Sequence, residues 1–87
     1  MANRPWDSQR SALTGALKDL RTKHGLTQAE LAERLEKPQS YVSKYEKGER
    51  KLDFIEVMQV CSALGVKPLA LIDLYENLLN PERNGPH

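Results

Sequence analysis

The strongest constraint on the fold is a pair of short helices joined by a tight turn, predicted between residues 27 and 48. Thr27 and Glu30 have the spacing of a capping box, in which each side chain accepts a hydrogen bond from a backbone N–H at the helix start. A helix is expected over 28–35, followed by a three-residue break. A second helix is expected over 39–47, opened by Pro38 and closed by Gly48. This pattern predicts a helix-turn-helix.

The remainder of the chain also has helical character. Apolar residues recur at helical spacing, whereas alternating apolar and polar runs and tight hairpin turns do not occur. Further helices are expected over 8–24, with Asp7 or Ser8 as the N-cap, over 53–64, and over 68–79. The expected apolar stripes are Leu13, Leu17 and Leu20; Leu31, Ala32 and Leu35; and Phe54, Val57, Met58, Cys61 and Leu64. The sequence predicts a compact, all-α domain of five helices over residues 8–79, with an N-terminal arm (1–7) and a flexible C-terminal tail (80–87).

The second helix of the motif carries a polar face. If Val42 and Tyr45 pack against the preceding helix, an outward stripe remains at i, i+3, i+4 and i+7. That stripe and its leading edge contain Gln39, Ser40, Ser43, Lys44 and Lys47. Glutamine can pair with adenine, lysine can donate to guanine, and serine can contact several bases. The alternatives are an ordinary solvated face or a helical hairpin with only a packing role.

Charge is sorted along the chain, although the net charge is only +1. Residues 37–51 contain five basic and two acidic side chains, whereas residues 52–87 contain two basic and five acidic ones. No acid occurs within 37–45. The positive segment therefore coincides with the second helix of the motif, as expected of a surface that binds the phosphate backbone of DNA.

Several motifs together resemble the Cro/C1-type (XRE) helix-turn-helix family. They are Leu20-Arg21-x-x-His24-Gly25-Leu26-Thr27-Gln28-x-Glu30-Leu31-Ala32, then Ser40-x-Val42-Ser43-Lys44-x-Glu46-x-Gly48, then Ala63-Leu64-Gly65-Val66. The resemblance covers about residues 13–72 and implies a lambda-repressor-like fold. Glu36 replaces the glycine often found in the turn, so it is expected to adopt a positive φ. Pro38 replaces the usual serine or threonine cap.

The resemblance also implies roles for individual residues. Gln39, Ser40, Ser43 and Lys44 match positions that face base edges. Gln28 matches a glutamine that contacts a phosphate and braces the recognition helix, and Arg21 and Glu46 match a pair that forms a salt bridge. Further DNA-backbone contacts are expected from Lys47, Arg50 and Lys51, and from Tyr41, for which the alternative is packing over the seam between the two helices. Arg4 and Arg10 are candidates for contacts with flanking DNA.

The last helix has more apolar surface than one small core requires. Val66, Leu71, Ile72 and Tyr75 are expected to close the core. Leu69, Leu74 and Leu78 would then be exposed unless a partner covers them. A two-fold homodimer through this helix is the simplest explanation, and it would place two recognition helices about one DNA turn apart on a palindrome.

Other functional classes have little support. No nucleophile–base pair can be assembled, so an enzyme is not expected, and neither cofactor nor metal is predicted because ligand spacing and glycine-rich phosphate loops are missing. No apolar run is long enough to cross a membrane, and the single cysteine, Cys61, fits a core position and a cytoplasmic setting.

The sequence therefore predicts a transcriptional regulator, such as a repressor, that acts as a homodimer on double-stranded DNA. Two alternatives remain open. One is an antitoxin-like module that binds another protein and uses DNA binding for autoregulation. The other is a helical adaptor that has lost DNA binding, for which no salt-dependent binding is expected.

Overall fold

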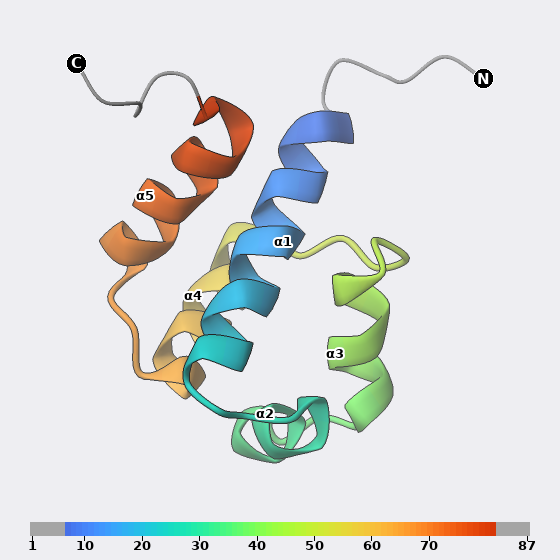
Figure 1. Cartoon of the computed structure of the whole chain (residues 1–87). Coiled ribbons are helices and arrows are strands. Elements are labelled where there is room, and N and C mark those ends of the chain that lie inside the picture. The colour runs from blue at the N-terminus through green and yellow to red at the C-terminus, as the bar shows by residue number, and fades with distance from the viewer. Residues whose placement is uncertain (1–6, 82–87) are drawn as a thin grey trace.

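A computed structural model describes residues 7–81 of the 87-residue chain. These residues form five α-helices and no strands (Figure 1). The helices are α1 (Asp7–Lys23), α2 (Gln28–Leu35), α3 (Gln39–Glu46), α4 (Phe54–Leu64) and α5 (Pro68–Leu79). Within the described part, no single helix has both the length and the apolar character to cross a membrane, although α4 and α5 pass that test as a pair bent by 108°.

The helices enclose one core, with α1 running between α3 on one side and α4 and α5 on the other (Figure 1). The largest side chains that are fully buried come from all helices except α5 and are Leu17, Leu31, Val42, Tyr45, Val60 and Cys61. The last helix adds Leu71, which is 4% exposed. Burial of these apolar side chains provides the main stabilisation of so small a domain.

Two helices begin with complete capping boxes. At α2, the Thr27 hydroxyl accepts from the Glu30 N–H and the Glu30 carboxylate accepts from the Thr27 N–H, at 3.0 and 2.8 Å. Asp53 and Glu56 form the same pair of bonds at α4, which therefore begins one residue later than expected. The first box was predicted and the second was overlooked. At α1, the helix already includes Asp7, so neither Asp7 nor Ser8 is the N-cap.

The turn between α2 and α3 has the geometry expected from its unusual residues. Glu36 is left-handed, with φ 57° and ψ 41°, and is the single non-glycine residue with positive φ among those described. Pro38 occupies the N-cap of α3 and provides no side-chain hydrogen bond. The chain reverses here because the Lys37 N–H donates to the Ala32 carbonyl at 3.0 Å and so closes the end of α2.

Three expectations about the core were wrong. Ile72 is 47% exposed rather than buried, whereas Leu74 is half-buried against the core rather than free. The side of α5 that packs on the core contains Leu71, Leu74 and Tyr75. Because α5 is apolar on most sides, periodicity alone does not predict which side is buried. Phe54, assigned to the core stripe of α4, is 75% exposed.

Replacing Glu36 with glycine is expected to stabilise the protein by about 0.5–1 kcal/mol. Glycine removes a left-handed penalty of roughly 1–2 kcal/mol, partly offset by its greater freedom in the unfolded chain. Urea unfolding of Glu36→Gly tests this. The matched control is Glu33→Gly in the exposed interior of α2, where a loss of about 1 kcal/mol is expected. Destabilisation by both variants would contradict the assigned turn conformation.

Candidate nucleic-acid interface

The outward face of α3 is the polar surface that the stripe predicted. Gln39, Ser40 and Lys44 are exposed and Ser43 is half-buried. The opposite face is anchored because Val42 and Tyr45 are fully buried in the core. The helix therefore presents amide, hydroxyl and ammonium groups on a rigid backbone, an arrangement suited to reading hydrogen-bonding groups on another molecule.

A buried network fixes α3 to both preceding helices. Arg21 of α1 donates from Nε to Glu46 Oε2 at 2.7 Å and from Nη2 to Oε1 at 3.1 Å. Gln28 of α2 donates from Nε2 to the same Glu46 Oε1 at 2.9 Å. The side chains of Arg21 and Glu46 are only 9% and 2% exposed. The hydrogen bond to Glu46 raises the pKa of Arg21, so the guanidinium keeps its charge.

Tyr41 is largely buried, unlike the polar side chains on the outward face of α3. Its residue exposure is 8%, and its ring packs edge-on against Tyr45 with 5.8 Å between centroids. The Arg50 guanidinium lies 4.7 Å from the ring centroid, and the Lys37 ammonium 5.4 Å from it. Burial raises the pKa of Tyr41. Burial and the contact with Arg50 favour the packing alternative for Tyr41. Its contact with the DNA backbone stays a prediction.

Arg50 also forms an ion pair within the protein. Its Nη2 donates to Glu56 Oε2 at 2.5 Å, and its side chain is 39% exposed. Glu56 uses its other oxygen for the capping box of α4. Arg50 thus joins the segment after α3 to the start of α4, and its guanidinium is less available to a phosphate than expected. The overlooked signal was the Asp53-x-x-Glu56 spacing.

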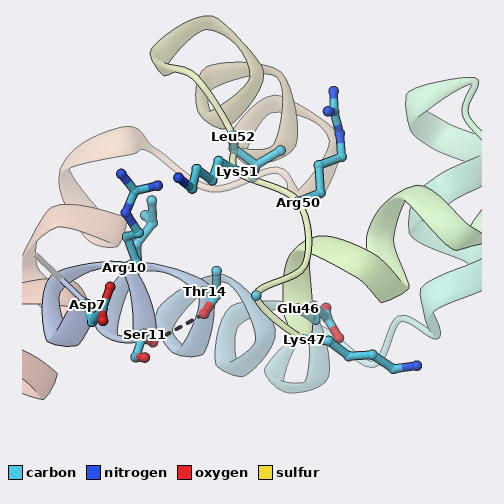
Figure 2. Close-up of a pocket in the computed structure, with 11 residues that line it drawn as sticks. Asp7, Arg10, Ser11, Thr14, Glu46, Lys47, Arg50, Lys51 and Leu52 are labelled. Carbon is cyan, nitrogen blue, oxygen red and sulfur yellow. Dashed lines mark hydrogen bonds between the residues drawn. The ribbon is translucent and has the colours of Figure 1, made fainter. Parts of the chain in front are cut away.

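Two lysines of the basic segment remain available. Lys47 and Lys51 are exposed, and neither forms an ion pair with any residue in the range 7–81. The structure brings them to the same side as the end of α3, where they line one cleft with Arg10 of α1 (Figure 2). The other arginine considered for flanking DNA, Arg4, lies outside the described residues.

A separate apolar patch occupies the starts of α4 and α5. Its most exposed members are Phe54 (75%), Ile55 (62%), Leu69 (71%) and Ile72 (47%). Phe54 and Ile72 line the same surface hollow. Of the residues expected to form a dimer contact, Leu69 belongs to this patch, Leu78 is 42% exposed farther along α5, and Leu74 faces inward. Sequence reasoning missed Phe54 and Ile55.

Metal binding has no candidate site in the described range, where no three His, Cys, Asp or Glu side chains are grouped to hold an ion. Cys61 is buried, and burial raises the pKa of its thiol. The thiol form is a weak nucleophile, so this cysteine acts as a core residue.

Comparison with known proteins gives a consistent result. A helix-turn-helix family model matches residues 17–71. The chain is 44% identical to an XRE-family like protein from Pseudomonas syringae pv. tomato str. DC3000, with a TM-score of 0.75 over 83% of this chain and 88% of that one. It is 29% identical to the clp gene regulator ClgR from Corynebacterium glutamicum, with a TM-score of 0.77 over 91% and 99% of the two chains.

A third similar structure is the restriction-modification controller protein C.Esp1396I. It is 21% identical, with a TM-score of 0.78 over 82% of this chain and 93% of that chain, and it shares the fold. That controller protein has also been crystallised as a tetramer with its natural 35 base-pair operator. No curated protein matches the sequence. The five-helix architecture expected from the sequence is confirmed by these structures.

Loss of Arg21 is expected to destabilise the protein far more than loss of Arg50. Arg21→Met leaves the Glu46 carboxylate buried without its cation, which should cost about 3–5 kcal/mol. Arg50→Met removes a more exposed ion pair and a ring contact, worth about 1–2 kcal/mol. Urea unfolding of the two variants measures the difference. Equal losses would mean that the buried network is not the principal constraint on α3.

Proposed function

Because this chain belongs to the XRE-type helix-turn-helix family of DNA-binding transcriptional regulators, we propose that it reads a palindromic operator as a homodimer, with α3 in the major groove. The family acts through DNA binding, and the chain is not an enzyme. The observation that carries the proposal is the outward face of α3, which is polar, free of acids through residue 45, and held by the Arg21–Glu46–Gln28 network.

Base selection is assigned to the exposed face of α3. The Gln39 amide has both a donor and an acceptor, which suits adenine, and the Lys44 ammonium suits the N7 and O6 acceptors of guanine. Ser40 and Ser43 add short hydroxyls that contact bases only when the helix approaches closely. All four lie on a helix whose opposite face is fully buried through Val42 and Tyr45, so the core limits how far their positions vary.

Backbone contacts are assigned to groups at the edges of this face. The first turn of α2 points N–H groups outward beside Gln28, where a phosphate is favoured. Lys47 and Lys51 supply mobile cations past the end of α3. Arg50 takes a positioning role, because its pairing with Glu56 holds the segment that carries these lysines. Phosphate contacts set the register of the protein, and base contacts select the sequence.

The apolar patch is assigned to a second copy of the chain. Phe54, Ile55, Leu69 and Ile72 present large apolar side chains that a monomer would leave in water. A two-fold axis through the patch makes it self-complementary and pairs two recognition helices, as a palindrome requires. The C.Esp1396I controller protein, which has the same fold, was crystallised as a tetramer on its operator, and this supports self-association in general rather than the choice of surface.

The proposal extends to the organisation of the chain. The DNA-binding domain corresponds to residues 8–79, with an arm over 1–7 and a tail over 80–87. Residues 1–6 and 82–87 lie outside the described residues. As a regulator of this type, the protein would repress transcription where its operator overlaps a promoter.

Selection of bound sites from a random DNA pool is expected to return a palindrome whose half-sites lie about one helical turn apart. Lys44→Ala should then lose roughly 1–3 kcal/mol on the selected site and relax preference at one base position. Lys51→Ala should weaken binding to selected and scrambled sites alike. A pool that yields no enriched sequence would contradict the proposed function. Equal losses on every sequence from both variants would contradict only the role of Lys44.

Substitution of Ile72 with aspartate is expected to convert the dimer to a monomer, because it places a charge within the apolar patch. Analytical ultracentrifugation at tens of micromolar measures the change. Affinity for a full palindrome should fall, while affinity for a single half-site should remain. Asn77→Asp is the matched control, since it adds the same charge to an exposed position of α5. A monomeric wild-type protein would contradict the proposal that the apolar patch binds a second copy of the chain.

A further inference from the structure

The surface hollow that Phe54 and Ile72 line has a volume of about 500 Å³ and lies between the first two turns of α1, the start of α4 and the middle of α5. Its apolar lining includes Leu13, Phe54, Val57, Leu71, Ile72 and Tyr75. Leu13, Val57 and Tyr75 are only half-buried, so the three helices do not fill the space between them. Within residues 7–81 the hollow remains open to water, and a further apolar group would be stabilised there.

The sequence places a tryptophan in register with the α1 wall of this hollow. The α1 side chains in the lining are Gln9, Arg10 and Leu13. At about 100° per residue, position 6 falls within the arc that these three positions span. It precedes Gln9 and Arg10 by three and four residues, the spacing at which side chains on one helix face meet. Trp6, the single tryptophan of the chain, therefore comes directly before α1 on the side of the hollow.

We propose that the hollow is the docking site of the N-terminal arm of the same chain, and that the Trp6 indole is the group that fills it. Because Trp6 is joined directly to α1, little loop entropy opposes docking within one chain. Docking removes a large aromatic surface from water, which is a substantial driving force. Ile55 and Leu69 of the apolar patch do not line the hollow, so the arm and a second copy of the chain can occupy neighbouring parts of the surface.

The polar groups around the hollow suit an indole. A buried indole N–H usually has a hydrogen-bond acceptor. Asp53 lines the hollow, and its carboxylate uses Oδ1 to accept from the Glu56 N–H at 2.7 Å, which leaves the other oxygen for a further donor. Arg10, which is also in the lining, supplies a guanidinium that can lie over the face of the ring. The hollow therefore offers both parts of an indole a favourable contact.

Charge also favours the arm as the occupant. Residues 1–6 contain Arg4 and no acid, whereas α4 and α5 contain Glu56, Asp73 and Glu76 and no basic side chain. Figure 1 shows the end of α5 and the start of α1 at the same end of the molecule, so the arm begins near an acidic helix. Attraction between exposed groups is weak. Burial of the indole therefore provides most of the driving force, and charge helps to direct the arm toward α5.

Tryptophan fluorescence tests the inference, because the emission comes from Trp6 alone. In the native protein the emission should be shifted to the blue of that in urea, and acrylamide should quench it several-fold less. NMR should show nuclear Overhauser effects between the indole protons and the methyl groups of Leu13 and Val57. Native emission and quenching equal to those of the unfolded chain would overturn the inference.

Two matched double variants locate the docking site. The hollow variant combines Phe54→Gln with Ile72→Gln, and the patch variant combines Ile55→Gln with Leu69→Gln. All four side chains are exposed members of the apolar patch, but only the first two line the hollow. The hollow variant should raise the quenching of Trp6 almost to that of the unfolded chain, and the patch variant should leave it unchanged. Circular dichroism checks that both remain helical. Equal exposure of Trp6 in both variants would contradict docking in the hollow.

Stability and dilution complete the test. Trp6→Ala should lower the folding equilibrium constant about tenfold, the change expected if about 60 Å² of indole surface is buried. In the hollow variant the same substitution should have no further effect, because its contacts are already lost. Protection of Trp6 should persist at concentrations where ultracentrifugation shows a monomer. Protection that appears only in a dimer would assign the hollow to the arm of a second copy and overturn docking within one chain. None of these results alters the proposed reading of DNA, which rests on α3.

Discussion

The arrangement of this domain depends on the buried ion pair between Arg21 and Glu46. Because both side chains are almost inaccessible, each needs the other: either charge alone would be buried without compensation. Gln28 donates to the same carboxylate, so three helices meet at one acceptor group. The orientation of α3 relative to α2 is therefore set before any partner is present. Association then requires little ordering beyond the exposed side chains, which limits the entropic cost of binding.

A second set of contacts extends this rigidity past the end of α3. The Tyr41 ring supports the Arg50 guanidinium, which in turn binds the Glu56 carboxylate. In this arrangement the Tyr41 side chain of α3 is turned inward, and Arg50 of the basic segment is held in an ion pair within the protein. The neighbouring Lys47 and Lys51 are held at their backbones yet keep free side chains. The backbone of this segment is therefore held in place, whereas its lysine side chains can change position.

Much of the fold could be predicted because local signals agree with one another. Capping chemistry and terminal glycines predicted the boundaries of the helices to within one residue, and Glu36 has the strained conformation expected of it. The outward stripe followed from helical periodicity alone. Errors arose where periodicity is ambiguous: α5 is apolar on most sides, so Ile72 and Leu74 could not be assigned to faces without the position of α1. The contact between the Tyr41 ring and Arg50 joins two segments, and no local sequence pattern encodes it.

The first turn of α4 has a consequence for how assembly and DNA binding influence each other. Asp53 and Glu56 hold this turn and, through Arg50, the segment that carries the proposed backbone contacts. Phe54 and Ile55, in the same turn, belong to the apolar patch. If two copies associate through the apolar patch, dimerisation immobilises this turn. The segment that Arg50 ties to the turn then also loses freedom. Thermodynamic linkage then requires reciprocity: DNA would tighten the dimer by the same factor by which the dimer tightens on DNA.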